Sequence, residues 1–175
     1  IDNQGLDEEL NKLRDEIKVI KDPICETQDT QCCNPKNLKL IGDVSNVNLF
    51  NKLKQTAKES NCLDSVIFKG KVKRDEIPSL LLNAKTLALA RPSNKQSEGG
   101  FPTKLGEYLA TGNPVIITRV GEVENFLIDN ENAFISSPNN SQNFAEKIGE
   151  VFNDYSKAKK IGQNGKLLIN TVFNY

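Results

Sequence analysis

The sequence predicts an α/β fold in which a parallel β-sheet is covered by helices on both faces. Two observations support this class. Short apolar segments alternate five times with amphipathic segments between residues 38 and 172. Most of the short segments are apolar at successive positions, as strands buried on both faces should be. Because such sheets bind ligands beyond the carboxyl ends of their strands, the loops that follow the strands are the first place to look for a site.

The expected strands cover residues 38–42, 65–70, 86–90, 114–118 and 133–136. The helices that follow them are expected at 48–60, 74–84, 101–111, 121–128, 141–154 and 156–172, with a polar loop at 93–100. Apolar residues recur at intervals of three and four in these helices, which gives each a buried face. We expect Asp75 and Ser141 as N-caps, because their side-chain oxygens accept hydrogen bonds from helix N–H groups.

The region before the first strand is expected to hold an amphipathic helix at 5–21 and a loop or insertion at 22–37. The four cysteines are Cys25, Cys32, Cys33 and Cys62, and the chain has no histidine. This spacing fits no common zinc site, so we expect reduced thiols and no metal, with a disulfide or a metal site as weaker alternatives. Reduced thiols indicate a cytoplasmic location.

The charge balance is even, with 23 lysine and arginine residues against 23 aspartate and glutamate residues. A surface that coats nucleic acid needs a clustered basic excess, so we expect no nucleic-acid partner. No apolar run approaches the roughly 20 residues that span a bilayer. A single small anion remains a plausible ligand, since one or two cations and some backbone N–H groups are enough to bind it.

The densest motif is "SEGGFPTKLGEYLATGNPVI" at residues 97–116. We expect a helix over 101–111 with Pro102 in its first turn and Gly112 at its end. The glycines at 99 and 100 let a ligand approach the backbone, and the helix start offers unpaired N–H groups and a positive dipole end. This arrangement predicts a cradle for a phosphate or diphosphate.

Glu107 lies one turn further along this expected helix. It shares a face with Thr103 and Lys104 by its spacing of four and three residues. Two interpretations stay open on spacing alone: Glu107 accepts hydrogen bonds from the two hydroxyls of a ribose, or it pairs with Lys104 on a solvated face. The opposite face, formed by Leu105, Tyr108 and Leu109, is expected to pack into the core.

The motif resembles the nucleotide-sugar motif of the retaining GT-B glycosyltransferases of family four, which places a glutamate, Gly-Phe, Pro and a second glutamate before Gly and Pro-Val. The segments "LKLIGD", "VIFKGKVKRDEIPSLLLNA" and "VGEVENFLIDNENAFISSPNNSQNFAEKIGEVFND" also resemble segments of this family. The resemblance covers about residues 38–170. It implies that the sheet is the Rossmann-like C-terminal half of a GT-B enzyme, that residues 1–175 form a single donor-binding domain, and that an N-terminal acceptor domain lies outside this chain.

The resemblance also implies roles for individual residues. Glu107 would hold the ribose hydroxyls, and Glu98 would contact the donor sugar, although its distance from Glu107 is one residue longer than the family pattern. The remaining donor contacts would come from Gly100, Phe101, Pro102 and Thr103 for the sugar and diphosphate, and from Lys71 and Val72 for the nucleobase. We add three candidates: Lys104 as a cation for the diphosphate, Arg91 as a second cation or a structural ion-pair partner, and Glu124 as a donor-face residue or a helix-start carboxylate.

The family usually supplies an arginine and a lysine from the start of this domain, and this chain has Gln4-Gly5 where Lys-Gly would be expected. The expected function is transfer of a sugar from a nucleoside-diphosphate sugar to an acceptor, with retained configuration and without a metal or other cofactor, in the synthesis of surface polysaccharide or a glycoconjugate. The acceptor and any membrane contact would be met by the N-terminal domain. Two alternatives are a non-catalytic GT-B-like scaffold and a nucleotide-sugar 2-epimerase.

Overall fold

The computed structural model describes residues 38–42, 46–98 and 102–171. The chain divides into two compact units, residues 1–77 and 78–175, and each is described by itself. The expected helix at 5–21, the expected loop at 22–37, Gln4 and three of the four cysteines lie outside the described residues. The expectation that residues 1–175 act as one donor-binding domain stays a prediction.

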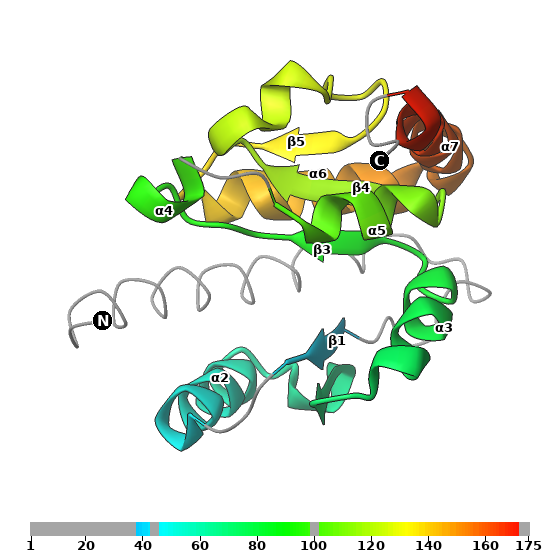
Figure 1. Cartoon of the computed structure of the whole chain (residues 1–175). Helices are drawn as coiled ribbons and strands as arrows, with labels where there is room; N and C mark the ends of the chain where they lie inside the picture. The colour runs from blue at the N-terminus through cyan, green and yellow to red at the C-terminus, as the bar shows by residue number, and fades with distance from the viewer. Residues whose placement is uncertain (1–37, 43–45, 99–101, 172–175) are drawn as a thin grey trace. The chain divides into compact units, whose positions relative to one another are not determined.

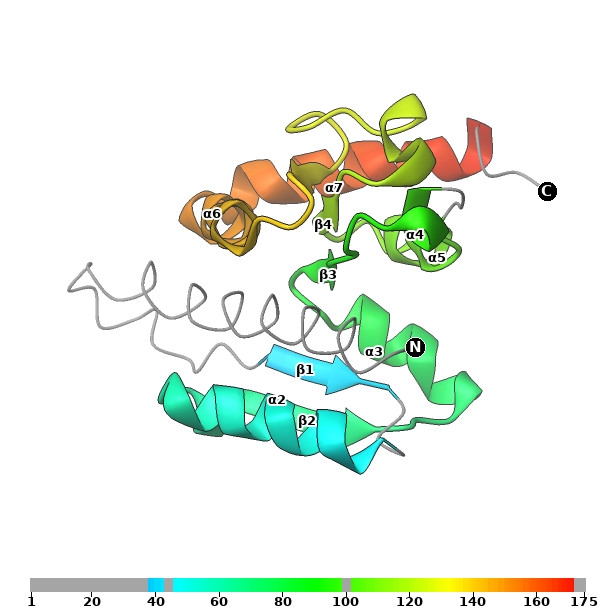
Figure 2. The same cartoon turned by 90° about the vertical axis from the view of Figure 1, so that its left-hand side faces the viewer.

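The first unit contains a pair of parallel strands, β1 (Leu38–Ile41) and β2 (Val66–Gly70), with helix α2 (Val47–Glu59) between them in the chain (Figures 1 and 2). Helix α2 packs on this pair through an edge-to-face contact between the rings of Phe50 and Phe68, whose centroids are 5.3 Å apart. Two short 3₁₀ turns follow, η1 (Leu63–Ser65) before β2 and η2 (Arg74–Glu76) after it. Gly70 ends β2 with a φ of 69°, a conformation that favours glycine.

The second unit contains a three-stranded parallel sheet in the order β3-β4-β5 (Figure 1). Its strands are β3 (Leu87–Leu89), β4 (Val115–Thr118) and β5 (Phe134–Ser136). The central strand is in register with both neighbours, since Ile117 pairs with Leu89 on one side and with Ile135 on the other. The prediction of parallel strands is confirmed, and the described strands are divided between two sheets, one in each unit.

Helices cover both faces of this three-stranded sheet, as predicted. Helix α5 (Lys104–Ala110) packs on one face, α6 (Ser141–Asn153) packs on the other, and α7 (Tyr155–Thr171) contributes to both hydrophobic clusters. The chain also forms α3 (Ile77–Leu82), α4 (Lys95–Glu98) and the 3₁₀ segment η3 (Gly121–Asn125) between β4 and β5. Alternate residues of β4 point to opposite faces, so the strand contributes to two separate hydrophobic clusters. Both faces therefore need covering, which explains the run of fully buried residues in this strand.

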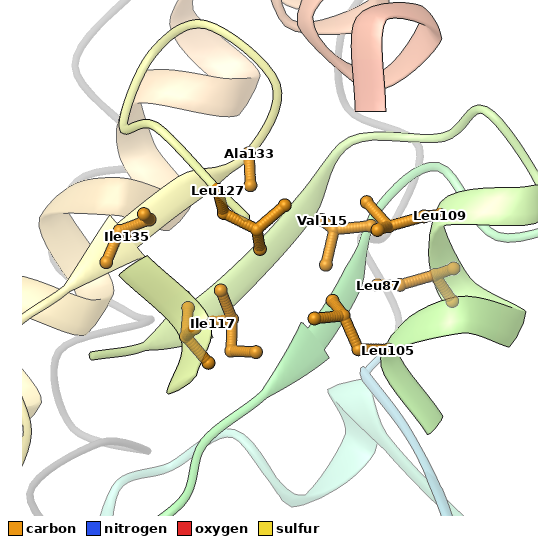
Figure 3. Close-up of a cluster of buried hydrophobic side chains, with 9 residues drawn as sticks. Leu87, Leu105, Leu109, Val115, Ile117, Leu127, Ala133 and Ile135 are labelled. Atoms are coloured by element: carbon orange, nitrogen blue, oxygen red, sulfur yellow. The ribbon is translucent and has the colours of Figure 1, made fainter. Parts of the chain in front are cut away.

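On one face, Leu105 and Leu109 of α5 are fully buried and pack with Leu87, Val115 and Ile117 (Figure 3). Each such leucine contributes about 2 kcal/mol by leaving water. On the other face, the cluster joins β4 and β5 to α6 and the first half of α7; its buried members are Ile116, Phe134, Phe144, Val151, Ala158 and Ile161. Helix α5 is thus fixed to the sheet by the apolar face that its sequence predicts.

Helix α7 approaches the loop before β4 closely because it carries a small residue there. A Cβ atom added to Gly162 would lie 2.6 Å from the carbonyl carbon of Asn113. Asn113 in turn accepts a hydrogen bond from Lys159 Nζ at 2.6 Å and donates from Nδ2 to the carbonyl oxygen of Leu81 at 3.1 Å. One buried asparagine therefore links α7, the entry to β4 and the end of α3.

Several local predictions are corrected. Asp75 lies inside η2, whose N-cap is Lys73, and α6 is capped by Asn140, which accepts a hydrogen bond from the Asn143 N–H group, so Ser141 is the first helical residue instead. Residues 121–125 form a 3₁₀ turn where a longer helix was expected, and part of the loop predicted at 93–100 is helix α4. At α6 and α4, the side chains of Asn140 and Asn94 accept hydrogen bonds from backbone N–H groups of the first turn and so fix where each helix begins.

Candidate functional site

The candidate site lies at the carboxyl ends of β3, β4 and β5. Because the strands are parallel, these ends meet at one edge of the sheet, which we call the carboxyl edge. In Figure 1 the strands of this sheet run toward the side on which α4 lies. The segments that leave this edge are residues 90–98 after β3, Arg119 and Val120 after β4, and residues 137–140 after β5. They include Arg91 and the backbone of Glu98 from the set of predicted site residues.

A reciprocal pair of hydrogen bonds shapes the turn that leads to Glu98. Asn94 Oδ1 accepts from the Ser97 N–H group at 2.9 Å, and the Asn94 N–H group donates to Ser97 Oγ at 2.9 Å. Ser97 Oγ also donates to the Pro92 carbonyl oxygen at 2.6 Å, and Ser97 is only 3% exposed. This is the pattern of a capping box with serine at the third helical position. The Asn94–Ser97 spacing was the sequence signal for α4, which the prediction of a loop overlooked.

The predicted phosphate cradle is described only in part. Glu98 is the last residue of α4, while its side chain and residues 99–101, which include Gly100 and Phe101, lie outside the description. Helix α5 begins at Lys104, three residues later than predicted, because Pro102 and Thr103 form the turn before it. Pro102 is buried, and its carbonyl oxygen accepts the Leu105 N–H group at 2.8 Å. Thr103 occupies the N-cap position, but its side chain makes no capping hydrogen bond.

The shared face of α5 is confirmed. Thr103, Lys104 and Glu107 are all exposed, whereas Leu105 and Leu109 are fully buried. Within the described part of the chain, no ion pair joins Glu107 to Lys104. The interpretation of Glu107 as the partner of Lys104 therefore has no support in this geometry, and its carboxylate is available to a ligand.

Tyr108 lies beside this carboxylate, half-buried against the core cluster. Burial raises the pKa of the Tyr108 phenol above its ordinary value, and the neighbouring Glu107 charge raises that pKa further. Tyr108 is consequently neutral at physiological pH. Its ring supports α5 without adding a second charge next to Glu107.

Arg91 is held at the carboxyl edge through its backbone. Its N–H group donates to Thr118 Oγ1 at 2.8 Å, and its carbonyl oxygen accepts from the same hydroxyl at 2.9 Å. The side chain is half-buried, and its Nη1 atom is buried without a hydrogen-bond partner. Among the described residues, no carboxylate forms an ion pair with it. The structural ion pair considered for Arg91 is therefore not observed, and a donor capable of binding an anion is left unused.

The other predicted residues differ in their surroundings. Lys71 is exposed and Val72 is half-buried; both follow Gly70 at the end of β2 and belong to the first unit. Glu124 pairs with Arg119 at 3.1 Å, and both side chains are more than half exposed, so this ion pair adds little to stability. Thr118 was not among the predicted site residues, because its contact with Arg91 joins residues 27 positions apart and leaves no local signal.

The described residues contain neither a candidate metal centre nor a membrane-spanning helix. Three or more histidine, cysteine, aspartate or glutamate side chains do not gather anywhere in that part of the chain in a way that could hold a metal ion. None of the described helices is both long and apolar enough to cross a membrane. A shallow depression along α7, lined by residues that include Tyr155, Lys159 and Gln163, contains none of the predicted site residues.

The chain is similar in sequence to proteins that transfer sugars. It is 33% identical over 130 residues to an uncharacterized glycosyltransferase of Methanocaldococcus jannaschii, and 30% identical over 130 residues to an alpha-1,3/1,6-mannosyltransferase of Dictyostelium discoideum. Each alignment covers 74% of this chain but only 34% and 30%, respectively, of the relative. The chain therefore spans about a third of the length of these relatives.

Solved structures share the fold. The Anabaena protein HepE, crystallised with UDP and glucose, superposes with a TM-score of 0.73 at 21% identity, over 93% of this chain and 40% of its own. The C-terminal domain of a glycosyl transferase group 1 family protein from Francisella tularensis superposes with a TM-score of 0.73 at 24% identity, over 93% of this chain and 78% of its own. The predicted fold, the C-terminal half of a GT-B glycosyltransferase, is confirmed.

The sequence pattern of the family described as glycosyl transferases group 1 matches residues 33–168. This range contains the whole of both described sheets and every predicted site residue. Neither the scaffold nor the epimerase alternative is favoured by these similarities. The chain belongs to the glycosyl transferases group 1 family.

Proposed function

We propose that this chain is the donor-binding domain of a retaining glycosyltransferase and binds a nucleoside-diphosphate sugar at the carboxyl edge. Membership of the family supports the proposal, as does HepE, whose structures hold UDP, UDP-glucose, or UDP with glucose. The observation that carries it is Arg91, whose buried Nη1 atom has no partner in a position where parallel sheets bind ligands. A diphosphate supplies the anionic acceptors that this donor lacks.

The proposed chemistry follows from the leaving group. When the bond from the sugar to the diphosphate breaks, negative charge develops on the diphosphate and must be stabilised. Lys104 and Arg91 are the cations assigned to that charge, together with backbone N–H groups among Gly100, Phe101 and Thr103. Glu107, exposed and without an ion-pair partner within the described residues, accepts the ribose hydroxyls.

The remaining roles complete the proposal. Glu98 contacts the donor sugar, and Lys71 and Val72 meet the nucleobase through their backbone. The reaction needs no metal, because the two cations take over the charge that a divalent ion would neutralise. A second domain brings the acceptor and any contact with a membrane. The product belongs to a surface polysaccharide or a glycoconjugate made on the cytoplasmic side.

The first test is calorimetric titration of the chain with UDP, GDP and ADP, with Glu107→Ala titrated in parallel. We expect one of the three nucleotides to bind. Glu107→Ala should weaken that binding by about 1.5–3 kcal/mol, the scale of hydrogen bonds to a charged group. Glu131→Ala is the matched control, because Glu131 is also exposed but precedes β5 at the opposite edge of the sheet.

Two results would contradict the proposal. The first is that none of the three nucleotides binds at millimolar concentration. The second is that Glu107→Ala and Glu131→Ala bind the preferred nucleotide equally well, which would remove the ribose role of Glu107 while leaving nucleotide binding itself in place.

A further inference from the structure

We propose that Thr118, the last residue of β4, is a positioning residue that fixes Arg91 for the diphosphate of the donor. This inference rests on the proposed function and adds a residue that the sequence motif does not include. Thr118 is 4% exposed, so it is not itself accessible to a ligand. Its effect on binding has to pass through the residue that it holds.

The contact between the two residues is reciprocal. Thr118 Oγ1 accepts from the Arg91 N–H group at 2.8 Å and donates to the Arg91 carbonyl oxygen at 2.9 Å. The last pair of residues between β3 and β4 is Leu89 with Ile117. Arg91 lies two residues beyond Leu89, and Thr118 lies one residue beyond Ile117, so both follow the end of the strand pairing. The Thr118 hydroxyl therefore holds the Arg91 backbone in place beside β4, as the backbone hydrogen bonds of the sheet hold β3.

The constraint is useful because the arginine carries an unused donor. A buried polar atom without a partner destabilises the fold, and native structures keep few of them. Nη1 of Arg91 is such an atom. The guanidinium group presents its donors in a rigid plane that matches phosphate oxygens. How well it binds a phosphate therefore depends on the position and direction that the backbone gives to the side chain. Fixing both backbone polar groups of Arg91 fixes the point from which its side chain starts.

The test compares Thr118→Val with Thr118→Ser. Valine keeps the shape of threonine and removes the hydroxyl, whereas serine keeps the hydroxyl and removes a methyl group. The affinity of the 175-residue chain for UDP and for uridine is measured by NMR titration of the labelled protein. We expect Thr118→Val to lower the affinity for UDP about tenfold and to leave the affinity for uridine unchanged, because uridine has no phosphate. Thr118→Ser should retain most of the UDP affinity.

A double-mutant cycle separates positioning from general damage. In the Arg91→Gln background, adding Thr118→Val should cause no further loss of UDP affinity, because the residue that Thr118 positions is already gone. Ser136→Ala is the matched control: Ser136 is the Cα partner of Thr118 on β5 and is fully buried, and its Oγ atom has no hydrogen-bond partner. It should leave the ratio of UDP to uridine affinity unchanged.

The outcomes are distinguishable. If the unmodified chain binds none of UDP, GDP and ADP, both the proposed function and this inference fail. If it prefers GDP or ADP, that nucleotide and its nucleoside replace UDP and uridine in every arm of the test. If it binds UDP and Glu107→Ala weakens the binding, but Thr118→Val does not, only this inference is overturned. An equal loss in Ser136→Ala, or additive losses in the cycle, would also overturn it. Should Thr118→Val fail to fold, Thr118→Ala takes its place, with the UDP-to-uridine ratio again the deciding quantity.

Discussion

The carboxyl edge of the three-stranded sheet and the opposite edge, which we call the amino edge, differ in how their polar groups are satisfied. At the amino edge, Asn113 links Lys159 to the carbonyl oxygens of Leu81 and Leu82, and the Tyr155 hydroxyl donates to the Lys85 carbonyl oxygen at 3.0 Å. At the carboxyl edge, Arg91 Nη1 and Ser136 Oγ are buried without partners. These are the only such side-chain atoms among the described residues of the second unit.

This difference separates structure from function within one sheet. Hydrogen bonds at the amino edge close the fold, because each joins segments that are far apart in the chain. The unused Arg91 donor at the carboxyl edge costs stability unless a ligand takes it up. The comparison predicts that substitution of Asn113 at the amino edge changes the free energy of unfolding, while substitution of Arg91 at the carboxyl edge changes the affinity for the donor.

The largest effect on stability is expected from Gly162→Ala, because the added methyl group would clash with the backbone at the amino edge, against which α7 packs. The added Cβ would lie 2.6–2.7 Å from backbone atoms of Asn113 and Pro114, which cannot give way without moving the entry to β4. We expect a loss of about 3 kcal/mol in the free energy of unfolding, measured in urea by circular dichroism. Gly106→Ala is the control: nothing lies within 4 Å of its added Cβ, and alanine favours the helix by about 0.5 kcal/mol or more. Equal effects of the two substitutions would contradict the close packing of α7.

The sharpest test of the comparison is a crossed pair, Asn113→Ala and Arg91→Gln. Asn113→Ala removes the buried link between α3 and α7 and should cost about 2 kcal/mol of stability, while the affinity for UDP stays within about twofold. Arg91→Gln should change stability by less than about 0.5 kcal/mol and lower the affinity for UDP by about tenfold or more. Urea unfolding and UDP titration of both variants complete the comparison. If each variant changed stability and affinity together, the two edges would not be separable.

A smaller effect concerns Lys147 of α6, which is 8% exposed and bonds Asp129 at 2.7 Å and Glu150 at 3.2 Å. Burial lowers the pKa of Lys147, but the hydrogen bonds and charges of Asp129 and Glu150 outweigh burial, so its pKa is raised above the ordinary value of 10.5. The stability from this network is fully present below that ordinary value and is lost as the pH rises through the raised pKa.

We therefore expect Lys147→Met to cost about 1.5 kcal/mol at pH 8 and progressively less above pH 10.5. Urea midpoints at pH 8 and pH 11 measure the difference. Burial also raises the pKa of the Tyr108 and Tyr155 phenols. Both tyrosines are present in the unmodified protein and in Lys147→Met, so their effect on stability is the same in both and does not change the difference. A gap between the two proteins that stays constant with pH would show that Lys147 contributes by packing alone.

The smallest effect is expected for Ser136→Ala at the carboxyl edge. The Ser136 hydroxyl has no partner, so its removal should leave the stability within about 0.5 kcal/mol or raise it slightly. The midpoint of urea unfolding measures this change. A loss above about 1 kcal/mol would mean that the Ser136 hydroxyl forms a hydrogen bond in solution. Arg91 Nη1 would then be the one atom that distinguishes the carboxyl edge from the amino edge among the described residues.

Periodicity predicted the parts of the fold that depend on local spacing. Leu105 and Leu109 are buried on the predicted face of α5, and Gly112 ends that helix with a φ of 69°. Spacing also placed Thr103, Lys104 and Glu107 together on the exposed face. These predictions succeeded because each one needs only residues within about one helical turn of each other.

The contacts that distinguish the two edges could not be predicted in this way. Thr118 meets Arg91 across 27 positions, and Asn113 meets Lys159 across 46. Hydrogen bonds over such distances depend on the order of strands and on the path of each crossover, which a single sequence specifies only through the whole fold. Capping at Asn140 and Asn94 was missed for a different reason, since several polar residues compete for each helix start.

Helix α5 has a consequence for how this protein can change. Its seven residues divide between core leucines and an exposed face that carries Lys104 and Glu107. Few positions on this helix can therefore be substituted during selection for a new donor sugar, because most of them are needed for the core or for the proposed donor contacts. Changes of donor preference should accumulate at exposed positions of the segments before it, such as Lys95 and Thr103.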